Sequence, residues 1–156
     1  SEQEEDGSWF GRWGTNYIYG TWSVLIALEH TDLPKNDPMY SKAVKWLKSI
    51  QHDDGGWGEG NQSYHDLSTS GQYHTSTAFQ TAWATLALMA AGEHECKEVQ
   101  AGIAYLLKSQ QQDGLWADNC HTSPGFPRVF YLKYHGYDKF FPLWALARYR
   151  NEKNSK

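Results

Sequence analysis

Aromatic side chains are the residues of this sequence best suited to a specific chemistry. The 156 residues include eight tryptophans, ten tyrosines and six phenylalanines, more than a routine core needs, so packing, stacking or a ligand must account for them. An aromatic face attracts a cation without offering it a base or a nucleophile. Four rings, called here the four-ring stripe, recur at helical spacing and would share one helix face: Phe126, Phe130, Tyr134 and Tyr137. Taken alone, such a stripe is more typical of ordinary core.

Metal and acid-base chemistry have weaker support. Asp118, Cys120 and His135 are residue types that can bind zinc, but we expect a satisfied surface carboxylate and a buried thiol. Asp53 and Asp54 fall in a turn signal and are not interpreted as a catalytic pair. We therefore expect no metal and no other cofactor.

Composition indicates a globular chain with no nucleic-acid partner. Apolar residues make up 40% and charged residues 21%, with a formal net charge of -4, and no cluster of Lys and Arg marks a face that would attract nucleic acid. No apolar stretch approaches the ~20 residues that a membrane span requires. The two cysteines, Cys96 and Cys120, favour a reducing, cytoplasmic setting over a disulfide framework.

One motif, Gln-x-x-Asp-Gly-x-Trp, occurs three times with identical internal spacing. Its copies run from Gln3 to Trp9, from Gln51 to Trp57 and from Gln110 to Trp116. The interval between copies suits two helices and their connections. The Asp-Gly pair predicts a turn at a helix end. The glutamine amide can satisfy backbone groups there, and the tryptophan can bring its indole N–H to a partner. We interpret the motif as a structural tie between adjacent outer helices.

Two kinds of helix are expected around these copies. Segments 43–50 and 99–107 are apolar on one face, which is typical of outer helices. Segments 22–28, 77–91 and 140–149 are more uniformly apolar, which is typical of inner helices, and Trp22, Trp83 and Trp144 recur in them at a constant interval. This alternation predicts an all-α fold, an α/α barrel or toroid of repeated helical pairs. No segment alternates with period two for long enough to predict a strand.

The repeats predict an incomplete ring. Only two residues precede Gln3, so the first copy lacks its outer helix, and three pairs would not close a ring of the usual six. We expect 1–156 to be the C-terminal part of one barrel domain in a larger protein. Such a part exposes inner-helix surface, so self-association is also expected.

The motif resembles the QW motif of the squalene-hopene and oxidosqualene cyclases. Stretches 9–22 and 125–137 resemble the bacterial hopene-forming branch, as do 80–83 and 141–146, so the resemblance covers nearly the whole chain. It implies an isomerase without a cofactor that protonates a terminal alkene of squalene and closes rings through successive carbocations. It also implies a full-length enzyme attached peripherally to the cytoplasmic face of a membrane.

The resemblance implies roles for individual aromatic residues. The four-ring stripe matches rings around the later cations. Trp13 matches a π face nearer the initiating end, and Tyr19 matches a member of the hydrogen-bond network that helps reprotonate the acid.

The sequence departs from the family in two respects. The acid motif Asp-x-Asp-Asp occurs nowhere in it, so we expect the segment to be inactive alone and to need the missing N-terminal part of the same enzyme. Phe79 stands where hopene-forming relatives generally carry a small polar residue, which leaves the product open, as is the choice between squalene and its epoxide.

Two other functions remain open at this stage. The first is a non-catalytic helical toroid that binds an apolar ligand or a protein partner. The second, less favoured, is a carbohydrate-processing toroid, which needs two carboxylates facing a Trp-rich cleft; most acids here fall in turns or at helix ends.

Overall fold

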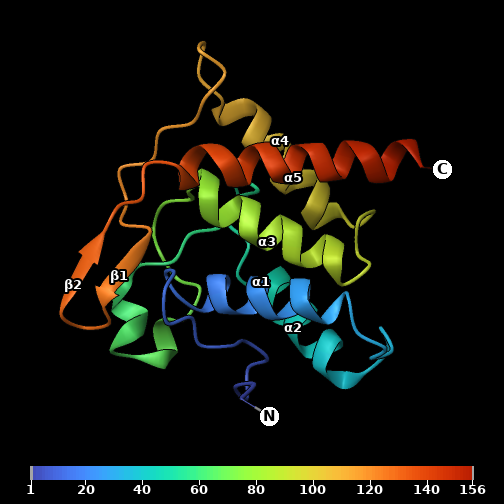
Figure 1. Cartoon of the computed structure of the whole chain (residues 1–156), viewed down its shortest axis with the longest axis horizontal. Coiled ribbons are helices and arrows are strands. Elements are labelled where there is room, and N and C mark those ends of the chain that lie inside the picture. Colours follow the sequence, from blue (N-terminus) through green and yellow to red (C-terminus); the bar gives the residue numbers. More distant parts are fainter. Residues whose placement is uncertain (1, 156) are drawn as a thin grey trace.

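Five α-helices in two layers form the framework of the computed structural model, which describes residues 2–155 (Figure 1). They are α1 (Tyr17–Leu28), α2 (Pro38–Ser49), α3 (Ala78–Ala90), α4 (Lys97–Ser109) and α5 (Tyr137–Asn154). α1, α3 and α5 lie side by side with α3 in the middle, and their N-terminal ends point the same way, while α2 and α4 lie behind them. The predicted alternation of outer and inner helices is confirmed.

A short β-hairpin lies at the N-terminal end of the inner helices (Figure 1). β1 (Ser123–Phe126) pairs antiparallel with β2 (Phe130–Leu132), and two 3-10 helices, η1 (Asn61–Tyr64) and η2 (Leu67–Thr69), lie nearby. The expectation of no strands was therefore wrong. The strands are too short, and too interrupted by proline and glycine, to show a period of two.

The hairpin also corrects the helical interpretation of the four-ring stripe. Phe126 ends β1, Phe130 begins β2 and Tyr137 begins α5. The spacing imitates a helix, but Pro127 lies in the hairpin turn, where Arg128 adopts a positive φ of 68°. A proline followed by a left-handed residue does not continue a helix.

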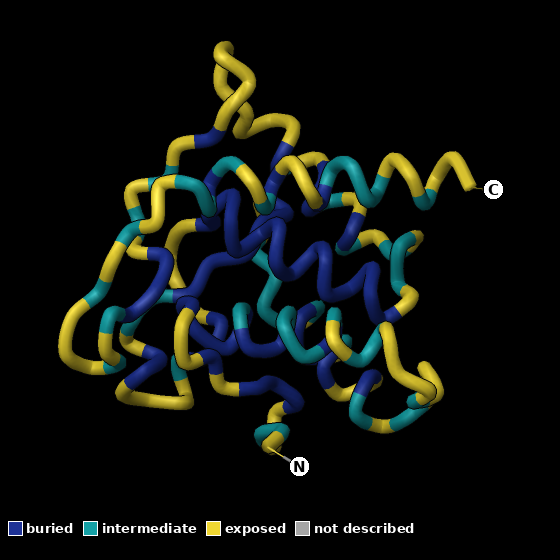
Figure 2. The backbone as a smooth tube through the Cα atoms, in the orientation of Figure 1, coloured by how far each residue is buried: buried dark blue, intermediate teal, exposed yellow. Residues whose placement is uncertain are grey.

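α3 is the centre of the core. Every one of its residues is buried, as Figure 2 shows by its unbroken dark blue trace. The helix packs against α1 and α5 within its layer and against α4 behind it, and alanines such as Ala82 and Ala87 permit close approach. α5 is covered by α3 on one side only and exposes Phe140, Leu143 and Trp144. Each helical pair thus depends on its neighbours for burial.

The glutamine of the repeated motif joins two outer helices. Gln51, just beyond α2, donates from Nε2 to the carbonyl oxygen of Gly55 at 2.8 Å and to that of Glu98, in the first turn of α4, at 2.9 Å. Gln3 repeats the arrangement, donating to its own copy's glycine and to Met39 in the first turn of α2 at 3.0 Å. The predicted tie is confirmed in both copies.

The tryptophan and glycine of the motif also behave as expected. Trp57 Nε1 donates to the carbonyl of Leu47 at 2.8 Å, and Trp116 Nε1 donates to that of Leu106 at 2.8 Å. Both carbonyls belong to the last turn of the preceding outer helix. Gly55 has a φ of +86°, the left-handed conformation that glycine adopts without strain. The motif therefore closes one outer helix and holds the next.

Within the described residues, the third copy lacks the bond from its glutamine to a neighbouring outer helix. Gln110 Nε2 donates to the carbonyl of Gly114 at 2.7 Å, and among the described residues it makes no hydrogen bond to another helix. A Cβ at Gly55 would lie 2.8 Å from the backbone of Ala101 in α4, and one at Gly7 of the first copy would lie 2.6 Å from the backbone of Lys42 in α2. At Gly114 the nearest atom is the Gln110 amide, 4.0 Å away. The place that an outer helix occupies in the other copies is open here.

We predict that Gln51→Ala lowers the free energy of unfolding by about 1–3 kcal/mol, because two carbonyl groups lose a shared donor. Denaturant unfolding of the full-length protein measures this. Gln111→Ala is the matched control, because Gln111 is exposed and its substitution should cost less than about 0.5 kcal/mol. Equal losses in the two variants would contradict the assigned role of the tie.

Candidate functional site

Trp83 is the centre of a ring cluster built from all three inner helices. Its fully buried indole lies 5.1 Å from the Tyr19 ring and stacks at 5.9 Å on Trp22, both from α1. From α5, Tyr137 and Phe141 approach it edge-on at 5.8 and 5.4 Å. Residues far apart in sequence thus meet because α1 and α5 flank α3. Tyr19 and Tyr137, two of the predicted site residues, both contact this indole.

The regularly spaced tryptophans converge in the same cluster. Trp22 also lies 6.0 Å from Trp144. Among the described residues, the indole N–H groups of Trp22 and Trp83 are buried and have no hydrogen-bond partner, so these two side chains contribute apolar rings. Phe79 is fully buried and contacts Trp83 edge-on at 5.1 Å. The added ring at this position therefore fills core space against the central tryptophan.

The four-ring stripe is divided into two pairs. Phe126 and Phe130 face each other across the hairpin at 5.7 Å, and Tyr134 lies 5.2 Å from Tyr137. In the part of the chain that the structure describes, no ring contact joins one pair to the other. Only Tyr137 reaches the Trp83 cluster directly. Phe126 is 58% exposed and Phe130 45%, so the hairpin pair is presented outward.

Two glycines leave room for candidate rings because they have no side chain. A Cβ at Gly125 would lie 1.9 Å from the Phe130 ring, and one at Gly14 would lie 2.3 Å from the Tyr19 ring. Distances this short require the ring to move. Each contact joins residues only five positions apart, across the hairpin turn or the start of α1.

Trp13 stands apart from the cluster. Its ring is 52% exposed, with the Arg12 guanidinium 5.2 Å from the ring centre. Arg12 and Arg128 also line an open hollow beside Phe126. Two guanidinium groups make this hollow unfavourable for a carbocation. Any cation-stabilising surface is therefore better placed at Phe130, Tyr134 and the Trp83 cluster.

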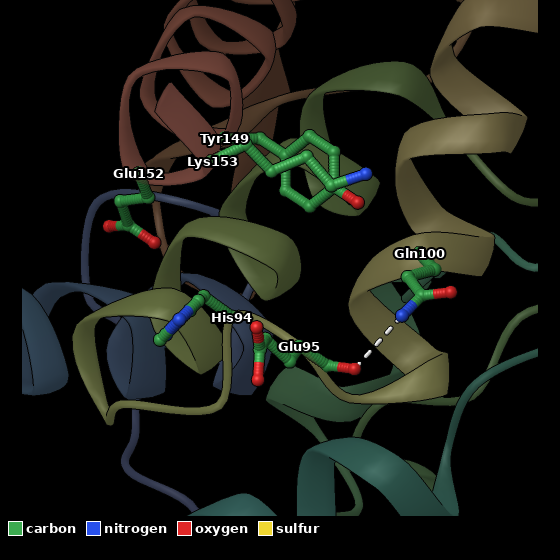
Figure 3. A pocket seen from close by; sticks show the side chains of 6 residues that line it. All are labelled: His94, Glu95, Gln100, Tyr149, Glu152 and Lys153. Carbon is green, nitrogen blue, oxygen red and sulfur yellow. Dashed lines mark hydrogen bonds between the residues drawn. The ribbon is translucent and has the colours of Figure 1, made fainter. Parts of the chain in front are cut away.

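A second hollow lies at the other end of α5 (Figure 3). Tyr149, Glu152 and Lys153 of α5 line it together with Gln100, which donates to the carbonyl of Glu95 at 2.9 Å. Its volume is about 140 Å³. Its charged lining and its position near the C-terminal end of α5 separate it from the candidate rings.

The zinc-type residues do not assemble into a metal site. Within residues 2–155, no group of three His, Cys, Asp or Glu side chains could hold a metal ion. Asp118 Oδ2 instead accepts from the backbone N–H of Ala78 at 2.8 Å and of Phe79 at 3.4 Å, in the first turn of α3. Asp118 is thus hydrogen-bonded as expected, but it is partly buried at the start of α3 and not a surface residue. Cys120 is a free thiol that is only partly buried, not fully buried as expected.

Glu59 is a buried carboxylate that sequence reasoning missed. It is 3% exposed and accepts from the backbone N–H groups of Asn16, Tyr17 and Ile18 at 2.9 to 3.1 Å. Burial raises its pKa, while these hydrogen bonds act in the opposite direction. Its role depends on contact between the segment after Trp57 and the start of α1, which residue spacing does not specify.

Burial also raises the pKa of Tyr137 and of Asp118. The pKa of Tyr137 is raised, first by burial and then by Tyr19 and Tyr134. Its hydroxyl therefore stays neutral at physiological pH. Burial raises the pKa of Asp118 to about 6, against the lowering effect of its N–H donors. Asp118 is mostly ionised at neutral pH.

The fold and the repeated motif define a class of helical-repeat protein whose outer helices are joined by glutamine and tryptophan. A family model described as the squalene-hopene cyclase C-terminal domain matches residues 1–151. The chain belongs to this family.

Individual relatives agree with the family match. The chain is 59% identical over 99% of its length to a squalene-hopene cyclase of Zymomonas mobilis, and 58% identical over 98% to one of Bradyrhizobium diazoefficiens. It is 44% identical over 96% to a dammaradiene synthase of Dryopteris crassirhizoma. The chain spans about a quarter of the length of these curated relatives, 23%, 23% and 24% respectively.

We predict that Asp118 makes stability depend on pH between about 4 and 6. The folded chain keeps this proton up to a pH of about 6, whereas an ordinary aspartate releases it near 3.8. The native state therefore binds more protons in this window, and this contribution to stability falls as pH rises. The melting temperature of the wild type minus that of Asp118→Asn should decrease from pH 4 to 6 and then level off. A difference that does not change with pH would exclude the raised pKa.

Proposed function

We propose that this chain contributes the aromatic, later-ring side of the cyclisation cavity in an enzyme that converts squalene to hopene or a related pentacyclic triterpene. The observation that carries the proposal is the convergence of Tyr19 and Tyr137 on Trp83. It is supported by the family match, because the matched relatives include squalene-hopene cyclases. One relative is a dammaradiene synthase, so the family match does not fix which triterpene is the product.

The chemistry follows from the ring faces. A cation over an aromatic face gains about 0.5–2 kcal/mol, more where water is excluded, and each 1.4 kcal/mol of barrier lowering is tenfold in rate. Tyr137 remains a neutral phenol because its pKa is raised, so it does not trap the cation as a phenolate would. Tyr134 and Phe130 would stabilise the later cations beside it. Trp13 and Tyr19 would act nearer the initiating end, Tyr19 through hydrogen bonding.

The remainder of the same enzyme is the proposed partner. The third motif copy leaves the site beside Gln110 and Gly114 open, and α5 exposes Phe140 and Leu143. An outer helix from that remainder would fill the open site as α4 does beside Gly55, and would extend residues 1–156 toward a closed α/α barrel.

The initiating acid and the membrane contact are also assigned to that remainder. The chain has no Asp-x-Asp-Asp motif, so residues 1–156 alone should give no hopene from squalene. Within residues 2–155, no helix has the length and apolar character to cross a membrane. Independently of that finding, we propose from the resemblance to the cyclases that the full-length enzyme is a peripheral protein of the cytoplasmic face. If the complete protein also lacked Asp-x-Asp-Asp, a non-catalytic helical toroid would be favoured instead.

We predict that Phe130→Ala in the full-length enzyme lowers kcat for squalene by about tenfold and increases incompletely cyclised products, because a later cation loses one ring face. Gly125→Ala should cause a smaller change in the same direction, because its Cβ displaces the Phe130 ring. The neighbouring Val129→Ala is the control, since Val129 is 74% exposed. Gas chromatography of the products measures all three. Unchanged rate and products in the first two variants would refute the pocket assignment.

We predict that Gln110→Ala destabilises the full-length enzyme as much as Gln51→Ala does, because a docked outer helix would give Gln110 a second carbonyl partner. Thermal unfolding of both variants beside Gln111→Ala measures this. If Gln110→Ala behaves like Gln111→Ala, no helix occupies the site beside Gly114.

A further inference from the structure

Two carboxylates cap inner helices from outside those helices. Glu59 accepts from three N–H groups in the first turn of α1, whereas Asn16, the N-cap residue of that helix, makes no side-chain cap bond. Asp118 accepts from two N–H groups at the start of α3. Helix starts leave such donors unpaired unless a side chain or solvent supplies an acceptor.

Both acids occupy the same place relative to the repeated motif. Glu59 lies two residues after Trp57, and Asp118 lies two residues after Trp116. In each case the capped helix is the inner helix that precedes that motif copy in the chain. The arrangement is thus part of the repeat, although the seven-residue motif does not contain it.

The Glu59 cap belongs to a buried network that joins α1 to α3. Gln80 of α3 accepts from the backbone N–H of Glu59 at 3.0 Å and donates to the carbonyls of Glu59 at 2.9 Å and Thr15 at 3.1 Å. The chain just before α1, the second motif copy and α3 are therefore held together at one point. Tyr19 lies in the first turn of α1, so this network sets its position against Trp83.

We propose that Glu59 and Asp118 are positioning residues for the aromatic site, which anchor the first turns of α1 and α3 and neutralise the positive ends of those helices. The hairpin, whose second strand begins with Phe130, lies at the N-terminal end of the inner helices (Figure 1). An uncapped helix start carries a partial positive charge, which would repel a carbocation there. In the ionised form, which the backbone N–H donors favour against the effect of burial, a carboxylate cancels that charge, which a hydroxyl cap cannot do. This inference rests on the proposed function.

The test compares an inner-helix cap with an outer-helix cap in the full-length enzyme. Glu59→Gln keeps the size of the side chain and removes its charge. Asp37→Asn is the matched control, because Asp37 caps the outer helix α2 by accepting from Met39 N at 2.8 Å. Both variants should lower the melting temperature. Only Glu59→Gln should lower kcat for squalene, by about tenfold, with KM unchanged within about twofold. An equal kcat in the two variants would overturn the proposal.

Asp118→Asn is a second variant that keeps the proposal testable if Glu59→Gln does not fold. α3 keeps its own cap in this variant, because Thr77 Oγ1 accepts from Gln80 N at 3.2 Å. Its kcat should fall by about threefold with KM unchanged, and a kcat equal to that of the wild type would count against the proposal.

Hydrogen exchange separates failure of this inference from failure of the proposed function. The amides of residues 16–18 should exchange faster in Glu59→Gln than in the wild type, and at the wild-type rate in Asp37→Asn. If the wild-type enzyme does not convert squalene, the proposed function fails, and faster exchange still supports the cap. Unchanged exchange in Glu59→Gln overturns the anchoring role whatever the substrate is.

Discussion

The structure depends on one side-chain amide that serves two carbonyl groups at once. Gln51 donates to its own turn and to the first turn of the next outer helix. A first-turn carbonyl accepts within its own helix, and its second lone pair can still receive the glutamine amide. The left-handed glycine that follows lets the two backbones approach to within contact distance. Outer helices are thereby spaced at a fixed interval, and the inner helices inherit that spacing.

The acids that lie two residues after the motif also fix the positions of helices in the inner layer. The glutamine of the second copy holds α4, while Glu59, a few residues later, caps α1. One short segment therefore sets the positions of two helices in different layers. α3 is buried along its whole length between its neighbours, so Trp83 receives rings from both sides. The aromatic cluster is a consequence of helix spacing as much as of aromatic content.

Most of the fold could be predicted from the sequence, and part of the site could not. The motif and the apolar periodicity gave the outer and inner helices, because these signals are local. The stripe from Phe126 to Tyr137 misled, because Pro127 and the left-handed Arg128 interrupt its helical spacing. The caps by Glu59 and Asp118 were missed because they join residues roughly forty apart. Contacts of that kind follow from the packing of repeats, which residue spacing does not specify.

The location of the carboxylates bears on how such a site could handle positive charge. A carboxylate with free oxygens beside a carbocation would act as a base and end the cascade early. Both Glu59 oxygens accept backbone N–H groups, and one oxygen of Asp118 does the same at α3. Their charge is thereby directed at helix ends and not at the rings. The two carboxylates can thus offset the partial positive charge at the helix starts, while the surface presented by Phe130 and Tyr137 stays aromatic and neutral.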